Sequence, residues 1–234
     1  MTAASPTVET QRPTGNPPPC PVCHAPGPRL LVALEGRTYW RCGHCAARFL
    51  DPAHHPAAEA ECAHYRLHEN DPDDPGYRRF LAKLATPLLA RLPPAASGLD
   101  YGCGPGPALA RMLEEAGHRV ALYDPFFFPQ PEALQQTYDF VTCTETAEHF
   151  HRPAGEFARL TRLVRPGGWL AIMTCFQTDD SRFADWHYRR DPTHVVFYRA
   201  ETFRWIAGTY GWSCETPGKD VAFLRRPAET GGAA

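Results

Sequence analysis

From residue 76 onward, the apolar positions follow two alternating spacings. Tyr77, Phe80, Leu81, Leu84 and Leu88 recur every three or four residues and stop before Pro93, which predicts an amphipathic helix. Short apolar runs then alternate with further segments of helical spacing. This order predicts strands at 98–101, 119–124, 138–145 and 169–176, and helices at 108–116, 153–164 and 200–210.

The alternation of strands and helices indicates one fold class. It is typical of a parallel sheet covered on both faces, and the fully apolar run 169–176 suits the middle of such a sheet. Segments 212–216 and 220–225 predict an antiparallel hairpin at one edge. The sequence therefore predicts a doubly wound, mostly parallel α/β sheet. The interval 125–137 is too short for a whole helix and strand, so we expect the third unit to be abbreviated.

The first 50 residues have a different pattern. Residues 1–19 are polar and rich in proline, and predict a disordered tail. Residues 20–50 carry a short hairpin, 29–35 with 38–41, between two pairs of cysteines, and predict a compact zinc-ribbon-like module. We therefore divide the chain into five parts: the tail at 1–19, the module at 20–50, a linker with N-terminal helices at 51–94, the α/β domain at 95–226 and a disordered tail at 227–234.

Composition places the chain among ordinary globular proteins. Its 234 residues are 43% hydrophobic and 21% charged, and the formal net charge is −2. Without a basic excess, nucleic acid stays open as a partner but is not favoured. No apolar stretch approaches the ~20 residues that span a bilayer, and the N-terminus lacks the apolar core of a signal peptide. We therefore expect a cytoplasmic protein that does not engage a membrane.

Four of the nine cysteines form two closely spaced pairs. Cys20 and Cys23 make one pair, and Cys42 and Cys45 make the other, with the spacing C-x2-C-x18-C-x2-C. In a reducing compartment this spacing indicates four thiolate ligands of a structural zinc ion, which would stabilise a segment too short to fold by its own core. A degenerate module that has lost its metal is the alternative. The isolated cysteines are interpreted mainly as small buried apolar residues.

A glycine-rich turn follows the strand predicted at 98–101. Gly102, Gly104 and Gly106 come after Asp100, and glycine permits both a positive φ and the close approach of a ligand. The spacing is not that of a dinucleotide fingerprint, and the lysine of a P-loop is absent. Asp124 ends the next strand about twenty residues later, where a carboxylate can accept hydrogen bonds from both hydroxyls of a ribose. The pattern indicates a site for a nucleoside-bearing cofactor.

These motifs resemble those of class I S-adenosylmethionine-dependent methyltransferases. The resemblance covers residues 95–226 and rests on residues 99–106, Asp124, residues 138–149 and residues 164–168. It implies a seven-stranded-type, Rossmann-like sheet and S-adenosylmethionine as the cofactor. It also implies the site residues: Asp100 in the cofactor turn, Gly102, Gly104 and Gly106 against the methionine end, Asp124 on the ribose, and Thr144 and Glu145 at the border of the cofactor.

This chain departs from the pattern of the methyltransferase family in two places and has an additional module in front of the domain. The third unit is short, and the aspartate that many relatives place near the adenine amino group is absent, so the resemblance identifies no adenine-binding residue. The cysteine module in front is similar to zinc ribbons that precede some ribosomal-RNA guanine methyltransferases and some deoxysugar C-methyltransferases.

The polar segment 177–198 follows a strand whose carboxyl end faces the predicted cofactor crevice. Long loops at such places are usually lids or binding loops, and Phe183, Trp186 and Tyr188 are costly to expose. We therefore expect the segment to face the substrate, with an ordinary surface insertion as the alternative. Its histidines His194 and His187 are candidate bases for the acceptor's proton, as is His149, and Glu145 would orient one of them.

Three functions fit the sequence. The favoured one is methyl transfer from S-adenosylmethionine to a small-molecule acceptor. The second is an RNA methyltransferase whose zinc module reads the substrate through Arg29, Arg37, Arg41 and Arg48. The third is a cofactor-binding protein without catalytic activity, against which the intact glycine turn and Asp124 weigh. Neither the acceptor atom nor the oligomeric state follows from the sequence.

Overall fold

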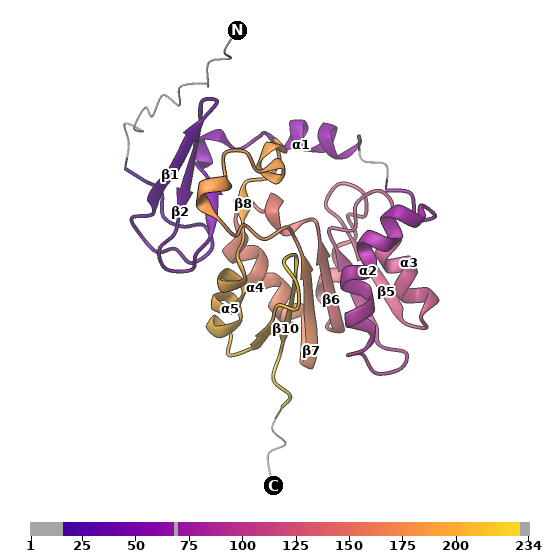
Figure 1. Ribbon diagram of the computed structural model, residues 1–234. Helices are drawn as coiled ribbons and strands as arrows, with labels where there is room; N and C mark the ends of the chain where they lie inside the picture. Colours follow the sequence, from indigo (N-terminus) through magenta and orange to yellow (C-terminus); the bar gives the residue numbers. More distant parts are fainter. Residues whose placement is uncertain (1–15, 68–69, 230–234) are drawn as a thin grey trace.

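The computed structural model describes residues 16–67 and 70–229, so residues 1–15 and 230–234 of the predicted tails lie outside the described residues. A six-stranded sheet in the order β5-β4-β6-β7-β10-β9 occupies the larger part of the chain (Figure 1). Its first four strands are parallel, whereas β10 is antiparallel to both β7 and β9. The strands are β4 (Ser97–Tyr101), β5 (Arg119–Tyr123), β6 (Tyr138–Thr144), β7 (Val164–Met173), β9 (Ser213–Glu215) and β10 (Val221–Arg225).

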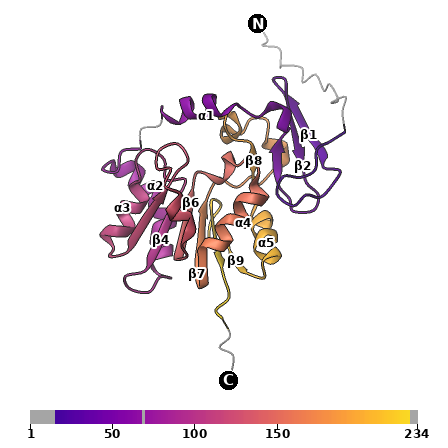
Figure 2. The same ribbon diagram turned by 180° about the vertical axis from the view of Figure 1, so that it is seen from behind.

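Helices cover both faces of this sheet (Figures 1 and 2). Side chains of α2 (Pro75–Leu89) and α3 (Ala108–Glu115) pack in one cluster with Ala171 and Met173 of β7. Those of α4 (Pro153–Leu163) and α5 (Ala200–Thr209) pack in another cluster with Leu170 and Ile172. Because successive residues of a strand point to opposite faces, the two helix pairs lie on opposite sides. The doubly wound α/β arrangement predicted from the sequence is confirmed.

The connection between β5 and β6 is short. Asp124 and Phe128 exchange backbone hydrogen bonds across a tight turn, and a 3-10 helix (Pro131–Gln135) then leads to β6. No α-helix or further sheet strand lies between residues 124 and 137, all of which the structure describes. The expected abbreviation of the third unit is confirmed, and it leaves β5 at the edge of a sheet with six strands instead of seven.

A second, antiparallel sheet builds the N-terminal module in the order β1-β2-β3-β8. The strands are β1 (Arg29–Leu34), β2 (Arg37–Arg41), β3 (Arg48–Leu50) and β8 (Val196–Phe197). The first two are the predicted hairpin. The fourth comes from the segment 177–198, where the sequence pattern predicted no strand, and it pairs with β3.

A backbone ladder joins the module to the main sheet. The amide of Leu50 donates a hydrogen bond to the carbonyl of Val195 over 2.8 Å. The amide of Val195 donates in turn to the carbonyl of Glu148 over 2.9 Å. Val195 follows His194, and Glu148 precedes His149, so the edge of the module fixes the backbone beside two predicted site residues.

Side chains join the module to the segment 177–198 as well. Arg48 is 5% exposed, and its guanidinium lies 2.7 Å from the Asp180 carboxylate. The Tyr39 ring packs against Phe183 and Phe197, with centroids 5.1 and 6.2 Å apart. The expectation that Phe183 faces the substrate is wrong, because this ring is buried in the contact with the module. From the module, α1 (Ala58–Tyr65) leads towards α2 (Figure 1).

Candidate active site

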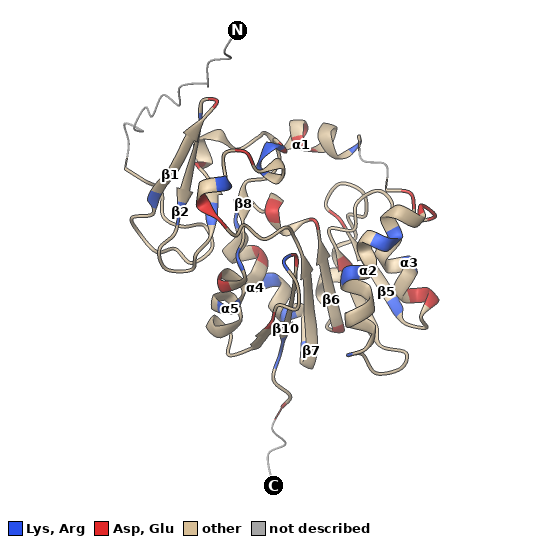
Figure 3. Ribbon diagram, viewed as in Figure 1, with Lys and Arg blue, Asp and Glu red and all other residues tan. Residues whose placement is uncertain are grey.

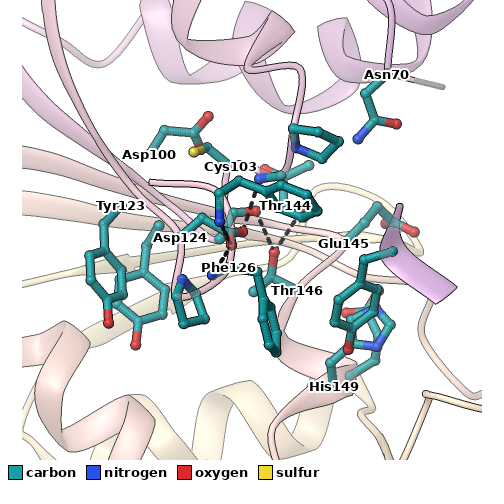
Figure 4. A pocket seen from close by; sticks show the side chains of 18 of the residues that line it. Asn70, Asp100, Cys103, Tyr123, Asp124, Phe126, Thr144, Glu145, Thr146 and His149 are labelled. Atoms are coloured by element: carbon teal, nitrogen blue, oxygen red, sulfur yellow. Dashed lines mark hydrogen bonds between the residues drawn. The ribbon is translucent and has the colours of Figure 1, made fainter. Parts of the chain in front are cut away.

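A cavity of about 730 Å³ lies beyond the carboxyl ends of β4, β5 and β6, where ligands bind in open α/β sheets. Its wall combines the glycine turn after β4, the loops after β5 and β6, the segment around α1 and the loop before β8 (Figure 4). The structure brings nearly all predicted site residues of the cofactor and the base to this wall: Asp100, Gly102, Gly104, Gly106, Asp124, Thr144, Glu145, His149 and His194. His187 is exposed and does not line the cavity.

The glycine turn packs closely against other parts of the chain. Gly102 and Gly104 have φ angles of +74° and +65°, a region that favours glycine. A Cβ atom on Gly102 would stand 2.2 Å from the Thr146 side chain, and one on Gly106 would stand 1.9 Å from the carbonyl oxygen of Asn70. Glycine is therefore required here by neighbouring protein atoms as well as by the conformation of the turn.

Asp124 connects the glycine turn with the loop after β5. Its Oδ2 accepts a hydrogen bond from the amide of Gly104 at 3.1 Å, and its Oδ1 accepts from the amides of Phe126 and Phe127 at 2.8 and 3.1 Å. Figure 4 shows the carboxylate at the wall of the cavity. A carboxylate has about four acceptor positions, so Asp124 keeps capacity for about one further donor.

Asp100 lies at the floor of the same end and is almost fully buried. Thr142 Oγ1 donates a hydrogen bond of 2.7 Å to Asp100 Oδ1. Burial, with a smaller contribution from the negative charge of Asp124, raises the pKa of Asp100 to about 6. Of the two carboxylates at this end of the cavity, Asp124 is held by backbone amides, whereas Asp100 becomes ionised only as the pH rises above about 6.

The other end of the cavity contains two glutamates around one tyrosine. The Tyr188 hydroxyl donates to Glu148 Oε1 and lies 3.3 Å from Glu145 Oε2. Burial, and secondly the charge of Glu148, raises the pKa of Glu145 to about 9. Glu145 is therefore a neutral acid at pH 7, able to donate a hydrogen bond. Its backbone φ of +48° is unusual for a residue with a side chain, as at many functional sites.

His149 and His194 present the same type of nitrogen to this end of the cavity. His149 Nδ1 lies 3.1 Å from the carbonyl of Thr193, and His194 Nδ1 lies 2.7 Å from the carbonyl of Tyr188. A carbonyl only accepts, so each Nδ1 carries hydrogen, and in the neutral form of each ring Nε2 carries the lone pair. The ring centroids are 4.7 Å apart. Burial lowers the pKa of His149, which keeps its ring neutral.

The four paired cysteines meet in the N-terminal module, away from the cavity. Their sulfur atoms all lie within 4.8 Å of one another. The Sγ atoms of Cys20 and Cys45 are 3.6 Å apart, and those of Cys23 and Cys42 are 3.5 Å apart. Four sulfurs at Zn–S distances of about 2.3 Å in a tetrahedron stand about 3.8 Å apart, so this group fits a zinc ion.

Several wall residues were not candidates in the sequence. Asp191 belongs to the segment 177–198, but no spacing distinguished it from its neighbours. Tyr188 does not line the cavity itself but contacts Glu145 and Glu148, which do. Glu148 had a local signal, because it stands three residues after Glu145 and directly before His149. Glu61 and Asn70 come from the linker, which carried no motif, and line the cavity only through the path of the chain around α1.

Comparison with known proteins agrees with this geometry. Residues 74–216, more than half of the chain, match a family model described as a methyltransferase domain. The chain belongs to this methyltransferase family. The matched span includes five of the six strands of the main sheet, all except β10, together with the glycine turn, Asp124, His149 and His194.

Curated relatives match over shorter segments. The ubiquinone biosynthesis O-methyltransferase of Serratia proteamaculans is 34% identical over 86 residues, which are 37% of this chain and 36% of that protein. The biotin biosynthesis bifunctional protein BioCD of Bordetella avium is 31% identical over 128 residues, 46% of this chain and 26% of that protein. The matching segments thus span about a third or less of these relatives' own length.

A solved structure shows the same methyltransferase fold. The 1,6-didemethyltoxoflavin-N1-methyltransferase of Burkholderia thailandensis, bound to 1,6-didemethyltoxoflavin and S-adenosylhomocysteine, has a TM-score of 0.50 and 16% sequence identity. The match covers 85% of this chain and 99% of that chain. Within residues 16–67 and 70–229, no helix has the length and apolar character needed to cross a membrane.

Proposed function

We propose that this methyltransferase transfers the methyl group of S-adenosylmethionine to a small-molecule acceptor. The observation that carries the proposal is the continuity of the cavity. One cavity connects the Asp124 carboxylate and the glycine turn with Glu145, His149 and His194. A cofactor held at the first end would present its methyl group to an acceptor held at the second, which is the positioning that in-line displacement requires.

The residues at the first end fit the cofactor. Asp124 has capacity for one donor from a ribose hydroxyl, and Asp100 with Gly102, Gly104 and Gly106 would enclose the methionine part. Thr144 Oγ1 is buried without a partner among the described residues, and Glu145 lies next to it. When bound, the cofactor supplies an electrophilic methyl group on a positively charged sulfur. The family match and a neighbour that holds S-adenosylhomocysteine support this assignment.

The residues at the second end suit an acceptor that loses a proton. His194 and His149 are the proposed catalytic residues, because each turns an Nε2 lone pair to the cavity. Glu145, protonated at neutral pH, would orient the acceptor or one of the imidazoles by donating a hydrogen bond. Tyr65 packs its ring against His149 and would limit the access of water.

The charge of the cavity favours a small molecule over RNA. Figure 3 shows Lys and Arg distributed over many elements instead of gathered along one face of this view. Acidic side chains outnumber the arginines in the wall and would repel a phosphate backbone. Apart from the neutral Glu145, the acidic residues are Glu61, Asp100, Asp124, Glu148, Glu156 and Asp191, and the arginines are Arg152 and Arg159.

We assign a structural zinc ion to Cys20, Cys23, Cys42 and Cys45. Four thiolates close the coordination shell, so the ion would stabilise the module and take no part in methyl transfer. Thiols kept free for a metal suit a reducing compartment, which supports a cytoplasmic location.

Two measurements test the proposed function. Titration calorimetry should show binding of S-adenosylmethionine and S-adenosylhomocysteine to the purified protein. Incubation with S-adenosylmethionine carrying a labelled methyl group and a pool of small metabolites should then give a labelled product. Absence of cofactor binding would overturn the proposal, whereas labelling of RNA alone would support the alternative acceptor. Cofactor binding without any turnover would support a protein without catalytic activity.

A further inference from the structure

Three potential metal ligands converge at the acceptor end of the cavity. Glu148, His149 and His194 each offer one ligand atom, and these atoms all lie within 4.8 Å of one another. All three residues line the cavity, and none is part of the cysteine group. We propose that Glu148, His149 and His194 bind a divalent transition-metal ion beside the acceptor, in addition to the ion held by the four cysteines.

The first argument is the state of the two imidazoles. Both Nδ1–H groups donate to backbone carbonyls, at 3.1 Å for His149 and 2.7 Å for His194. Such a bond fixes the tautomer and the ring orientation, and it is the usual second contact of a histidine that binds metal through Nε2. Both carbonyls belong to the loop before β8, so one loop orients both ligands.

The second argument is a buried carboxylate oxygen without a partner. Glu148 is 1% exposed, and its Oε1 accepts from the Tyr188 hydroxyl. Its Oε2 is buried and has no hydrogen-bond partner within the described part of the chain. An uncompensated buried carboxylate oxygen is costly, and a bound cation would remove that cost. Tyr188 would then be the contact that orients this ligand.

The ligand types select the class of metal. Two imidazole nitrogens and one carboxylate oxygen suit borderline divalent ions such as Zn²⁺, Fe²⁺, Mn²⁺ or Co²⁺, and leave coordination positions open. The cysteine group differs in the ions that its ligands prefer and in its coordination, because four thiolates prefer soft ions and complete a tetrahedron. The chain therefore has one closed site in the module and one open site at the cavity wall.

An open site next to the acceptor specifies how the acceptor reacts, and this part rests on the proposed function. With their Nε2 lone pairs on the ion, His149 and His194 would act as ligands in place of the role as bases. A hydroxyl oxygen of the acceptor would occupy an open position, and coordination would release its proton to a water molecule. The oxygen would then form a bond to the methyl carbon, while the bond from that carbon to sulfur breaks and its electron pair stays on sulfur. The acceptor class is therefore an alcohol or a phenol, with S-adenosylhomocysteine as the second product.

The test uses Co²⁺ with full-length protein whose cysteine site already holds zinc. Wild-type protein should take up about one further equivalent of Co²⁺, with ligand-field bands but no thiolate charge-transfer band. His149→Ala and His194→Ala should each weaken Co²⁺ binding at least about tenfold. Tyr188→Phe, which removes the hydroxyl contacts to Glu148, Glu145 and Thr174 but no proposed ligand, should weaken it about tenfold.

His151→Ala is the matched control, because His151 lines the same cavity but contacts Glu61 at 2.8 Å and lies outside the ligand group. Its affinity for Co²⁺ should equal that of the wild type. Circular dichroism and the unfolding midpoint establish that each variant is folded. The proposal is overturned if zinc-loaded wild type takes up no Co²⁺, or if folded His149→Ala and His194→Ala bind it as the control does. Binding of S-adenosylhomocysteine, measured without Co²⁺, tests the proposed function separately.

Discussion

The Asp124 carboxylate fastens two loops as well as lining the cavity. Its three backbone hydrogen bonds hold the amide of Gly104 in the turn after β4 and those of Phe126 and Phe127 after β5. A change at Asp124 therefore acts twice on a nucleoside ligand. It removes the acceptor proposed for a ribose hydroxyl, and it releases the turn proposed to border the rest of the cofactor.

Asp124→Ala should weaken the binding of S-adenosylmethionine by at least about tenfold, since hydrogen bonds to a charged group contribute about 1.5–3 kcal/mol. Titration calorimetry measures this. Asp139→Ala is a suitable control, because Asp139 also accepts a backbone hydrogen bond, from Ser97 at 2.8 Å, but at the amino end of β6. Wild-type affinity in the Asp124 variant would show that the ribose lies elsewhere.

Asp100 makes the stability of the fold depend on pH. Burial raises its pKa from 3.8 to about 6, so between these values the folded protein keeps a proton that the unfolded chain releases. The free energy of unfolding contributed by this group is therefore highest below about pH 4. It falls by about 3 kcal/mol as the pH rises to about 6.

Asp100→Asn should abolish this fall, because the amide oxygen still accepts from Thr142 and no longer titrates. Urea denaturation at several pH values between about 4 and 7 measures the difference between variant and wild type. If both proteins lost the same stability over this interval, Asp100 would not be the group responsible.

At the scale of elements, the regular strands and helices follow from the sequence, whereas the contacts between distant segments do not. The predicted hairpin at the module and the hairpin of β9 and β10 are both present, since their apolar patterns and turns are local. The two-residue strand β8 has no periodicity to recognise, and its partner β3 lies near the other end of the chain. Phe183 was assigned to the substrate for the same reason, because nothing local indicated Tyr39 as its partner.

The contact between β3 and the segment 177–198 includes the ion pair of Arg48 and Asp180, which substitution of Asp180 alone would remove. Asp180→Ala leaves the Arg48 guanidinium, 6% exposed, without its carboxylate. We expect a loss of about 2–3 kcal/mol in the free energy of unfolding, less than for a fully buried pair because Asp180 is about a quarter exposed.

Urea denaturation of Asp180→Ala tests this expectation against Glu115→Ala. Glu115 forms ion pairs with Arg78 and Arg111 on the surface, and the loss of such pairs costs about 0–1 kcal/mol. Equal stability of the two variants would mean that the Arg48 pair is not a significant part of the interface.

At the scale of the whole molecule, the cysteine module and the main sheet share one core. A single cluster of buried side chains includes Cys20 and Phe49 of the module, Phe183 and Phe197 of the segment 177–198, and Leu224 of β10. Continuous packing of this kind predicts cooperative unfolding. The ion assigned to the cysteines would therefore stabilise more than the module.

Cys42→Ser should lower the metal content by about one zinc ion per chain and reduce the unfolding temperature of the whole protein in a single transition. Elemental analysis and scanning calorimetry measure the two effects. Cys214→Ser, at a partly exposed cysteine outside the group, should change neither metal content nor cooperativity. A second transition that stays at the wild-type temperature would show that the main sheet unfolds independently of the module.

Most of the cofactor end was predictable, because Asp100, the glycine turn and Asp124 follow consecutive strands and parallel strands end at one edge. The acceptor end of the cavity was less predictable from the sequence. His149 and His194 were chosen as separate candidates, and their meeting depends on the loop before β8. Asp191 and Glu61 were not foreseen as wall residues, because their positions depend on how the loop before β8 and the segment around α1 cross the cavity, which no local pattern specifies.

The ladder from Leu50 through Val195 to Glu148 also bears on synthesis of the chain. β3 leaves the ribosome long before its outer neighbour β8 is made. Until then, β3 presents unpaired amides and carbonyls at an open edge, next to apolar side chains that have no cover. We expect the nascent chain to need protection from aggregation until β8 has been made, and the acceptor pocket to form only after that.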